Sequence, residues 1–346
     1  MRLKVGFDGK PLLRPKAGVA RYAEGLLSGL ATLPPEELEV VVVYPEKPTR
    51  TAPWVLWNLQ KATRRGFSVF HFPFYYTPLF PACPVTVAIH DVLVLSHPQW
   101  FPKACANTLR WLIPITARKA SAIVTGSRWV AQEIVRLCRV PRRRVRVIPP
   151  GVDRRLFAPP APTTLAQELL ELGLNRPYLL MVGALEPRRG VDTLLSAWEI
   201  LRPRFPELEL VLAGPLRSPV AALAQRPKEV RLLGYVEDRV LPVLYAGAQV
   251  VVAPSRGEGF DLPVLEALAC GACVVASDIP VHREVFSGAV RFFAAGDAEA
   301  LAAELREVLD NAQERQKLRE SGLVLAESFS WEKAAREHWA LWREVA

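Results

Sequence analysis

The chain has no run of eighteen apolar residues, the shortest run that would suggest a membrane-spanning helix, although half of its 346 residues are hydrophobic. Residues 1–7 also lack the charged head, apolar middle and small-residue cleavage site of a secretory signal. We therefore expect a cytoplasmic protein, with peripheral contact to the inner face of the membrane as an alternative.

Cysteine is scarce, with five residues, of which only Cys270 and Cys273 lie close together in sequence. An odd number of cysteines without a secretory signal argues against a disulfide framework. A zinc or redox site would need a second pair or a histidine cluster, and the sequence shows neither. We expect reduced cysteines packed in the interior, and no metal site.

The net charge of +9 is unevenly distributed. Residues 1–160 hold 24 Lys and Arg against 9 Asp and Glu, a net charge of +15, whereas residues 161–346 hold 20 against 26, a net charge of −6. The basic half is suited to an anionic partner. Arg64, Arg65 and Arg142–Arg144 would then contact an anionic lipid surface or a lipid diphosphate. The alternative is that this charge only aids solubility or steers an anionic acceptor.

Short, nearly continuous apolar runs alternate with amphipathic stretches along the chain. The apolar runs predict strands at residues 3–8, 38–44, 68–72, 85–91, 122–126, 145–148, 178–182, 208–213, 230–233, 250–253, 273–276 and 290–293. The amphipathic stretches predict helices at residues 19–30, 104–119, 128–138, 191–201, 262–269, 298–321 and 331–343. This alternation indicates an α/β protein whose parallel sheets are covered by helices on both faces.

A proline-rich stretch separates two halves that follow the same plan. Residues 149–162 contain five prolines and one glycine, which neither sheet could accommodate, so they predict a linker. We place one doubly wound, Rossmann-like domain at residues 1–155 and a second at residues 156–330. Ligands bind such folds at the carboxyl ends of the strands, and a two-domain enzyme would face these edges towards each other across a cleft.

Residues 254–273 carry the strongest chemical signal. A strand ending at Ala253 is followed by a loop with two glycines and by a helix that starts near Leu262. The N–H groups and the dipole at a helix start favour an anion such as a diphosphate. Glu258 lies on the loop, which we expect to be exposed, and Glu266 lies about one turn into the helix. Carboxylates suit sugar hydroxyls, because each accepts more than one hydrogen bond.

With its two glutamates separated by seven residues, this stretch resembles the donor-site motif of the family 4 retaining glycosyltransferases, which have the GT-B fold. Segments 18–22, 88–91, 183–190 and 233–236 follow in that family's order. The sequence of these segments is most similar to a bacterial mannosyltransferase-B-like branch of the family. The resemblance implies two Rossmann-like domains facing each other across a cleft, and a C-terminal helix at 331–346 that packs back onto the first domain.

The resemblance also implies roles for individual residues. Glu266 would hold the ribose hydroxyls of a nucleotide-sugar donor. A catalytic group of four would consist of Glu258 on the sugar hydroxyls, Arg188 and Arg189 on the diphosphate, and His90 beside the anomeric carbon. Further donor contacts would come from Gly18, Gly183, Gly234, Tyr235, Val236, Gly259, Phe260, Asp261 and Leu262.

The chain departs from the family pattern at three positions. Arg189 stands where lysine is more frequent, Ala184 where arginine or threonine is frequent, and Asp261 where glycine is usual. An aspartate at this position adds a carboxylate near the sugar and disfavours a left-handed backbone. No Asp-x-Asp triplet occurs, so we expect neither metal nor cofactor, the leaving diphosphate being stabilised by arginines and the helix start.

The predicted reaction, in polysaccharide biosynthesis, moves a hexose, with mannose as the expected sugar, from a GDP- or UDP-linked donor to a saccharide or lipid-linked acceptor. Retention fits a double displacement through a carboxylate. It also fits same-face attack assisted by the departing phosphate, which the resemblance suggests. His71, at another strand end, suits an acceptor contact and a structural role equally.

Three other classes of protein compete with this interpretation. A nucleotide-sugar epimerase shares the architecture, and a phosphorylase would need a pyridoxal lysine at a strand-end loop, which the second half lacks. A non-enzymatic nucleic-acid binder would explain the basic half, but not the pairing of Glu258 with Glu266. The sequence contains no nucleic-acid-binding motif, so we expect no nucleic-acid partner.

Overall fold

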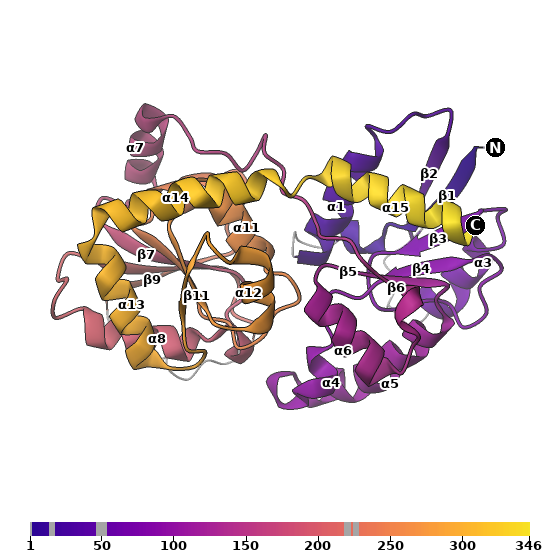
Figure 1. Ribbon diagram of the computed structural model, residues 1–346, viewed down its shortest axis with the longest axis horizontal. Coiled ribbons are helices and arrows are strands. Elements are labelled where there is room, and N and C mark those ends of the chain that lie inside the picture. Colours follow the sequence, from indigo (N-terminus) through magenta and orange to yellow (C-terminus); the bar gives the residue numbers. More distant parts are fainter. Residues whose placement is uncertain (1, 14–17, 46–53, 218–222, 224–227) are drawn as a thin grey trace. The chain divides into compact units, whose positions relative to one another are not determined.

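The computed structural model describes residues 2–13, 18–45, 54–217, 223 and 228–346. The chain divides into two compact units: unit 1 comprises Met1–Gly151 with Phe329–Ala346, and unit 2 comprises Val152–Ser328. Within the described residues, each unit contains a six-stranded parallel sheet flanked by helices (Figure 1). The α/β class and the doubly wound sheets predicted from the alternating pattern are therefore confirmed.

The two sheets have related strand orders. In unit 1 the order is β2-β1-β3-β4-β5-β6, and in unit 2 it is β12-β11-β10-β7-β8-β9. The strands of unit 1 are β1 (Leu3–Asp8), β2 (Leu38–Val43), β3 (Val69–Phe72), β4 (Val85–Ala88), β5 (Ala122–Thr125) and β6 (Val145–Val147). Those of unit 2 are β7 (Tyr178–Val182), β8 (Glu209–Ala213), β9 (Val230–Gly234), β10 (Val250–Ala253), β11 (Val274–Ser277) and β12 (Arg291–Phe293). Each predicted strand is confirmed and differs from the prediction only at its ends.

Helices connect the strands in both units. Unit 1 contains α1 (Gly18–Leu30), α3 (Gln60–Ala62), α4 (Leu93–Ser96), α5 (Lys103–Lys119), α6 (Arg128–Cys138) and α15 (Trp331–Val345). Unit 2 contains α7 (Pro162–Glu171), α8 (Val191–Leu201), α10 (Leu241–Gly247), α11 (Leu262–Ala269), α12 (Pro280–Phe286), α13 (Ala298–Asp310) and α14 (Ala312–Glu327). Short helical turns lie at η1 (Lys10–Leu13), η2 (Trp54–Leu59), η3 (Pro98–Trp100), η4 (Arg142–Arg144) and η5 (Pro187–Arg189).

The helices differ from the prediction in two ways. The single helix expected at 298–321 is wrong: Asn311 is extended between α13 and α14, and its side chain accepts a hydrogen bond from the backbone N–H of Glu314. Short α3 and α4 were not predicted, and neither were α7, α10 and α12, which each have a proline in their first two positions, namely Pro162, Pro242 and Pro280. Proline is favoured there because the first N–H groups of a helix have no partner within it. The last proline of the expected linker therefore begins α7.

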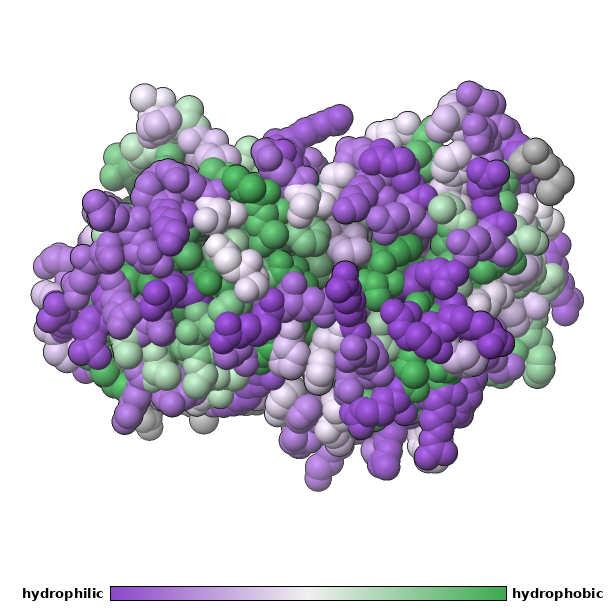
Figure 2. Space-filling view, in the orientation of Figure 1, coloured by the Kyte–Doolittle hydropathy of each residue, from purple (hydrophilic) through white to green (hydrophobic). Residues whose placement is uncertain are grey.

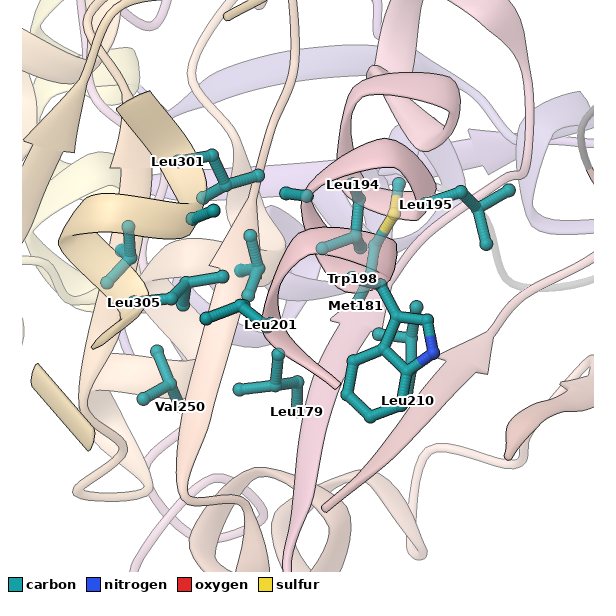
Figure 3. Packing of buried hydrophobic residues seen from close by; sticks show 14 of the residues in the cluster. Leu179, Met181, Leu194, Leu195, Trp198, Leu201, Leu210, Val250, Leu301 and Leu305 are labelled. Atoms are coloured by element: carbon teal, nitrogen blue, oxygen red, sulfur yellow. The ribbon is translucent and has the colours of Figure 1, made fainter. Parts of the chain in front are cut away.

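The core of unit 2 lies between its sheet and helices α8 and α13. Trp198 of α8 is fully buried beside side chains from β7 and β8, while Leu301 and Leu305 extend towards the same cluster from α13 (Figure 3). Burying each leucine side chain contributes about 1.5–3 kcal/mol to the stability of the fold. This packing holds the strands whose carboxyl ends carry the predicted donor residues.

The C-terminal helix α15 belongs to unit 1, where it packs against α1 (Figure 1). Glycines of α1 allow the close approach: a Cβ atom added to Gly29 would lie 2.2 Å from the carbonyl oxygen of Trp331. The hydroxyl of Tyr22 lies 2.8 Å from Nε2 of His338, and the indole N–H of Trp342 donates to Thr86. The end of the chain thereby completes the core of unit 1.

Two further features bear on the sequence-based expectations. None of the described helices combines the length and the apolar character needed to cross a bilayer. All five cysteines are free; Cys138, Cys270 and Cys273 are buried, Cys83 is half-buried, and Cys105 is exposed. The prediction that the cysteines pack in the interior is confirmed for Cys138, Cys270 and Cys273 and is wrong for Cys105.

Gly29→Ala should destabilise unit 1, because the new methyl group would push the backbone of α15 away from α1. We expect a loss of about 1–3 kcal/mol in the free energy of unfolding, measured by urea denaturation followed through tryptophan fluorescence. Ser28→Ala, at an exposed position of the same helix, is the matched control and should change stability little. Equal unfolding midpoints for the two variants would contradict this account of the packing.

Candidate functional site

The sheet of unit 2 reverses its strand order between β7 and β10. β7 is the first strand in sequence; β8 lies on one side of it, while β10 and β11 lie on the other. The connections that leave β7 and β10 therefore turn to opposite faces of the sheet and leave a crevice at the carboxyl ends. A small recess opens here, lined in part by Arg189 and Asp261.

The loops that follow β7 and β10 are fastened to each other. Gly190 has a positive φ of 68°, and a Cβ atom there would lie 2.0 Å from the carbonyl oxygen of Pro254. The side chain of Arg256 donates to the carbonyl oxygen of Pro187 and pairs with Asp192 at 2.5 Å. These contacts hold the arginines of the first loop against the acidic residues of the second.

The charged side chains of Arg188, Arg189, Glu258 and Asp261 meet between these loops, and Glu186 pairs with Arg188 at the edge of this charged cluster. Nη1 of Arg189 lies 2.6 Å from Oε1 of Glu258 and 3.1 Å from Oδ1 of Asp261. Arg188 lies 3.4 Å from Oε2 of Glu258 through Nη1, and 2.6 Å from Glu186 through Nε. The side chain of Glu258 is 6% exposed, so the prediction of an exposed loop glutamate is wrong. Buried charges require such pairing, since desolvation would otherwise cost several kcal/mol.

The carboxyl groups of Glu258 and Asp261 have opposite pKa shifts. Burial raises the pKa of Glu258, and the nearby charge of Asp261 adds to that effect, while Arg189 and Arg188 oppose it. Burial would also raise the pKa of Asp261, but Arg189 and His282 outweigh it and lower the pKa to about 2. Asp261 is therefore ionised at neutral pH, and Glu258 is the carboxylate closer to protonation.

Helix α11 begins beside this cluster. Asp261 precedes it with φ 75° and ψ 70°, the left-handed conformation that glycine would adopt more easily, and its side chain does not cap the helix. Pro263 has no N–H, and the N–H groups of Val264 and Leu265 donate to the carbonyl oxygen of Asp261, so the N–H of Leu262 and the helix dipole are what favour an anion here. Glu266 lies further along α11, buried, and accepts a hydrogen bond from the hydroxyl of Tyr245 at 3.2 Å.

The other predicted donor residues of unit 2 lie along the same edge of the sheet. The N–H of Gly183 donates to the carbonyl oxygen of Ala213 at the end of β8. The N–H of Gly214, which follows Ala213, donates to the carbonyl oxygen of Gly234 at the end of β9. Tyr235 follows with half of its surface exposed. The structure therefore brings Arg188, Arg189, Glu258 and Asp261 into contact, with Gly183 beside them. Gly259, Phe260 and Leu262 lie in the same loop and helix start, whereas Gly234, Tyr235 and Val236 lie at the far strand β9.

In unit 1, His90 follows β4 and is half-buried. Its Nε2 donates to the carbonyl oxygen of Pro73 at 3.0 Å, and its ring lies edge-on to Tyr22. Burial lowers the pKa of His90, so the ring is neutral and Nδ1 is its acceptor. Gly18 is the first residue of α1, with open space around its Cα. His71 is fully buried against Thr86, which supports the structural role considered for it rather than an acceptor contact.

Two buried polar residues were missed by the sequence interpretation. His282 of α12 contacts Asp261 from behind the cluster, and no local pattern marks it. Asp8 ends β1, where an acid after an apolar strand was a usable signal; it accepts hydrogen bonds from Trp54 and Tyr76, and burial raises its pKa. In the described part of the chain, no group of three or more His, Cys, Asp or Glu side chains is arranged to hold a metal ion.

The fold and these motifs define a glycosyltransferase of the GT-B class. Residues 150–323 match the family model of group 1 glycosyl transferases, and residues 31–156 match that of glycosyltransferase family 4. The chain belongs to this family. It is 30% identical over 280 residues to the O-antigen chain mannosyltransferase B of Escherichia coli, covering 78% of this chain and 72% of that protein.

Solved structures share the fold across nearly the whole chain. Sucrose-phosphate synthase from Thermosynechococcus elongatus aligns with a TM-score of 0.78 and 20% identity, over 99% of both chains. HepE from Anabaena, solved with UDP and glucose, aligns with a TM-score of 0.78 and 18% identity, over 99% of this chain and 100% of that one. The expected GT-B architecture is therefore confirmed.

Proposed function

We propose that this glycosyltransferase moves a hexose, with mannose as the expected sugar, from a nucleotide diphosphate donor to a saccharide or lipid-linked acceptor. The transfer retains the anomeric configuration and requires no metal ion. Similarity to the O-antigen chain mannosyltransferase supports mannose. HepE, which shares the fold, was solved with UDP and glucose, and this supports a nucleotide-sugar donor.

The observation that carries the proposal is the charged cluster at the strand-order reversal of unit 2. Arg189 contacts Asp261 at the start of α11 and Arg188 contacts Glu258 of the preceding loop, at the crevice where doubly wound sheets bind ligands. The buried Nε of Arg189 has no hydrogen-bond partner within the described residues. A buried donor without a partner costs about 1–3 kcal/mol, a cost that an anionic ligand would remove.

The same cluster suits the breaking of a sugar–phosphate bond. Negative charge builds on the leaving diphosphate in the transition state, and cations that are already in place then stabilise it most. Glu258 would accept hydrogen bonds from sugar hydroxyls, and Glu266 from the ribose. The arginines and the helix start take the part that a divalent ion plays in other transferases.

We assign retention to attack on the face from which the diphosphate leaves, with the departing phosphate accepting the proton of the acceptor hydroxyl. The alternative is a covalent intermediate on a carboxylate. His90 is neutral, with Nδ1 as an acceptor, and would take a hydrogen bond from a sugar hydroxyl. The anomeric configuration of the product, read by proton NMR, decides whether retention holds.

Glu258→Gln should lower kcat about 10- to 100-fold, because an isosteric amide cannot replace a charged acceptor for the sugar hydroxyls. Glu266→Gln should instead raise the donor KM, since the ribose is bound alike in ground and transition states. Nucleotide release from a panel of GDP- and UDP-sugars provides the assay, and exposed Glu299→Gln is the control. Wild-type turnover in Glu258→Gln with the preferred donor would refute the site.

Transfer should survive incubation with EDTA, because Arg188, Arg189 and the start of α11 would meet the charge of the diphosphate. We expect kcat to change less than about twofold after chelation, whereas loss of a key donor of this kind costs about 100- to 1,000-fold. Complete inactivation by EDTA, reversed by magnesium or manganese, would contradict the metal-free mechanism.

We further propose that unit 1 contacts an anionic membrane surface through α5. This helix contains no Asp or Glu, and it exposes Trp111, Lys103 and Arg110. Figure 2 shows hydrophilic side chains around a small apolar patch in the region where Figure 1 places α4, α5 and α6. Interfacial tryptophan next to basic residues suits anionic lipid.

The arginine run suggested from sequence is less suited to lipid. Arg142 donates to the carbonyl oxygen of Val145, and Arg144 donates to those of Arg118 and Ala120. These bonds tie the end of α5 to the start of β6. The contact surface therefore shifts from that run to α5.

Co-sedimentation with vesicles tests this contact. Binding should increase with the fraction of anionic lipid and decrease with salt, because salt screens the attraction between basic side chains and anionic headgroups. Each basic residue contributes about 1 kcal/mol at most to that attraction. Arg110→Gln should weaken binding about fivefold, while Arg204→Gln, exposed in unit 2, should not change it. Protein that stays in the supernatant at low salt with strongly anionic vesicles would exclude the membrane contact.

A further inference from the structure

His282 of α12 contacts the charged cluster from the side opposite Arg189. Its Nε2 lies 3.1 Å from Oδ2 of Asp261, while Oδ1 of the same carboxylate lies 3.1 Å from Nη1 of Arg189. The His282 side chain is fully buried and that of Asp261 is 2% exposed. One carboxylate is therefore shared between an imidazole and a guanidinium, away from water.

The hydrogen bonds of His282 determine its protonation. Nδ1 lies 2.9 Å from the carbonyl oxygen of Ser277, which can only accept, so Nδ1 carries a proton. The Ser277 hydroxyl, 3.3 Å from Nδ1, is not an alternative donor to it, because it already donates to the carbonyl oxygen of Ser255. Asp261 is paired with the guanidinium of Arg189 through its other oxygen and, as a carboxylate, also can only accept, so Nε2 carries a proton as well.

Resting on the proposed function, we propose that His282 is a buried imidazolium that positions Asp261 on Arg189 and balances the charge of the donor site. With His282 charged, three cations (Arg188, Arg189 and His282) face three carboxylates (Glu186, Glu258 and Asp261). With a neutral His282 the group would carry one net negative charge. That charge would repel a nucleotide diphosphate at short range in a medium of low dielectric constant.

The backbone of Asp261 agrees with this assignment. Residues other than glycine rarely adopt φ near 75°, and holding one there costs about 1–3 kcal/mol unless its surroundings enforce it. The paired bonds to His282 and Arg189 supply that enforcement. An aspartate in a position that suits glycine therefore serves to place a negative charge between two cations.

Nitrogen NMR tests the protonation state directly in the whole chain, without any substrate. In a spectrum of protein labelled with ¹⁵N-histidine at about pH 7.5, both ring nitrogens of His282 should have the shifts of protonated nitrogen. Absence of its signals from His282→Gln assigns them among the five histidines. A ring nitrogen with the shift of an unprotonated acceptor would overturn the proposal.

Nucleotide affinity tests the charge balance. We would titrate GDP and UDP into wild type, His282→Gln and the double variant His282→Gln/Asp261→Asn, and use the nucleotide that wild type binds more tightly. Glutamine can still donate to Asp261 but brings no charge, so Kd should rise about tenfold. The double variant is again neutral and should recover most of that loss, which a purely structural role would not predict.

Arg283→Gln is the matched control, because it lies on the same helix and breaks an exposed pair with Asp278. Its Kd should equal that of wild type. An unchanged Kd in His282→Gln, or a double variant no better than His282→Gln, would overturn the proposal while nucleotide binding itself stands. If wild type binds neither nucleotide, the proposed donor fails, and the NMR result alone then decides whether His282 is the imidazolium. If His282→Gln fails to fold, single Gln variants of the other four histidines assign the signals of His282 by elimination, and the NMR result then decides the question.

Discussion

Two buried carboxylates facing two arginines are the constraint on which the organisation of unit 2 depends. Glu258 and Asp261 are almost entirely removed from water, and leaving either unpaired would cost several kcal/mol. Arg188 and Arg189 offset that cost only while the loops after β7 and β10 remain in contact. The strand order brings these loops together, and the close approach of Gly190 to the second loop keeps them there.

This pairing also reconciles stability with the proposed chemistry. In the absence of donor, the arginines and carboxylates balance one another's charge, and Nε of Arg189 is left without a hydrogen-bond partner among the described residues. A site rich in charge can therefore be buried without a ligand, while one donor remains for an anion. A bound diphosphate would compete with Glu258 for the arginines and free that carboxylate for sugar hydroxyls. Asp261 would stay in place, because His282 holds its second oxygen. The cluster is then a set of preorganised charges whose partners change on binding, rather than a rigid salt bridge.

The sequence predicted the strands well because strands buried on both faces are continuously apolar, a pattern that needs no knowledge of neighbours. The strand–loop–helix pattern pointed to Glu258, and the family resemblance pointed to Arg188 and Arg189, which the structure brings into contact with it. The sequence interpretation failed where packing between distant segments decides. Glu258 is buried against Arg188 and Arg189 of another loop, and the contact of His282 with Asp261 arises only when α12 folds against the start of α11. Pro162 was interpreted as part of a linker rather than as the start of a helix, so α7 was missed. Asn311 interrupts an amphipathic pattern that would otherwise predict one continuous helix.

A crystal structure with a bound nucleoside diphosphate would test the central claim most directly. The account predicts its terminal phosphate within hydrogen-bond distance of Arg188 or Arg189 and of the N–H of Leu262 at the start of α11, with the ribose hydroxyls on Glu266. The contact between Arg189 and Glu258 should lengthen from its present 2.6 Å. A nucleotide bound elsewhere, with this ion pair unchanged, would contradict the assignment of the charged cluster as the donor site.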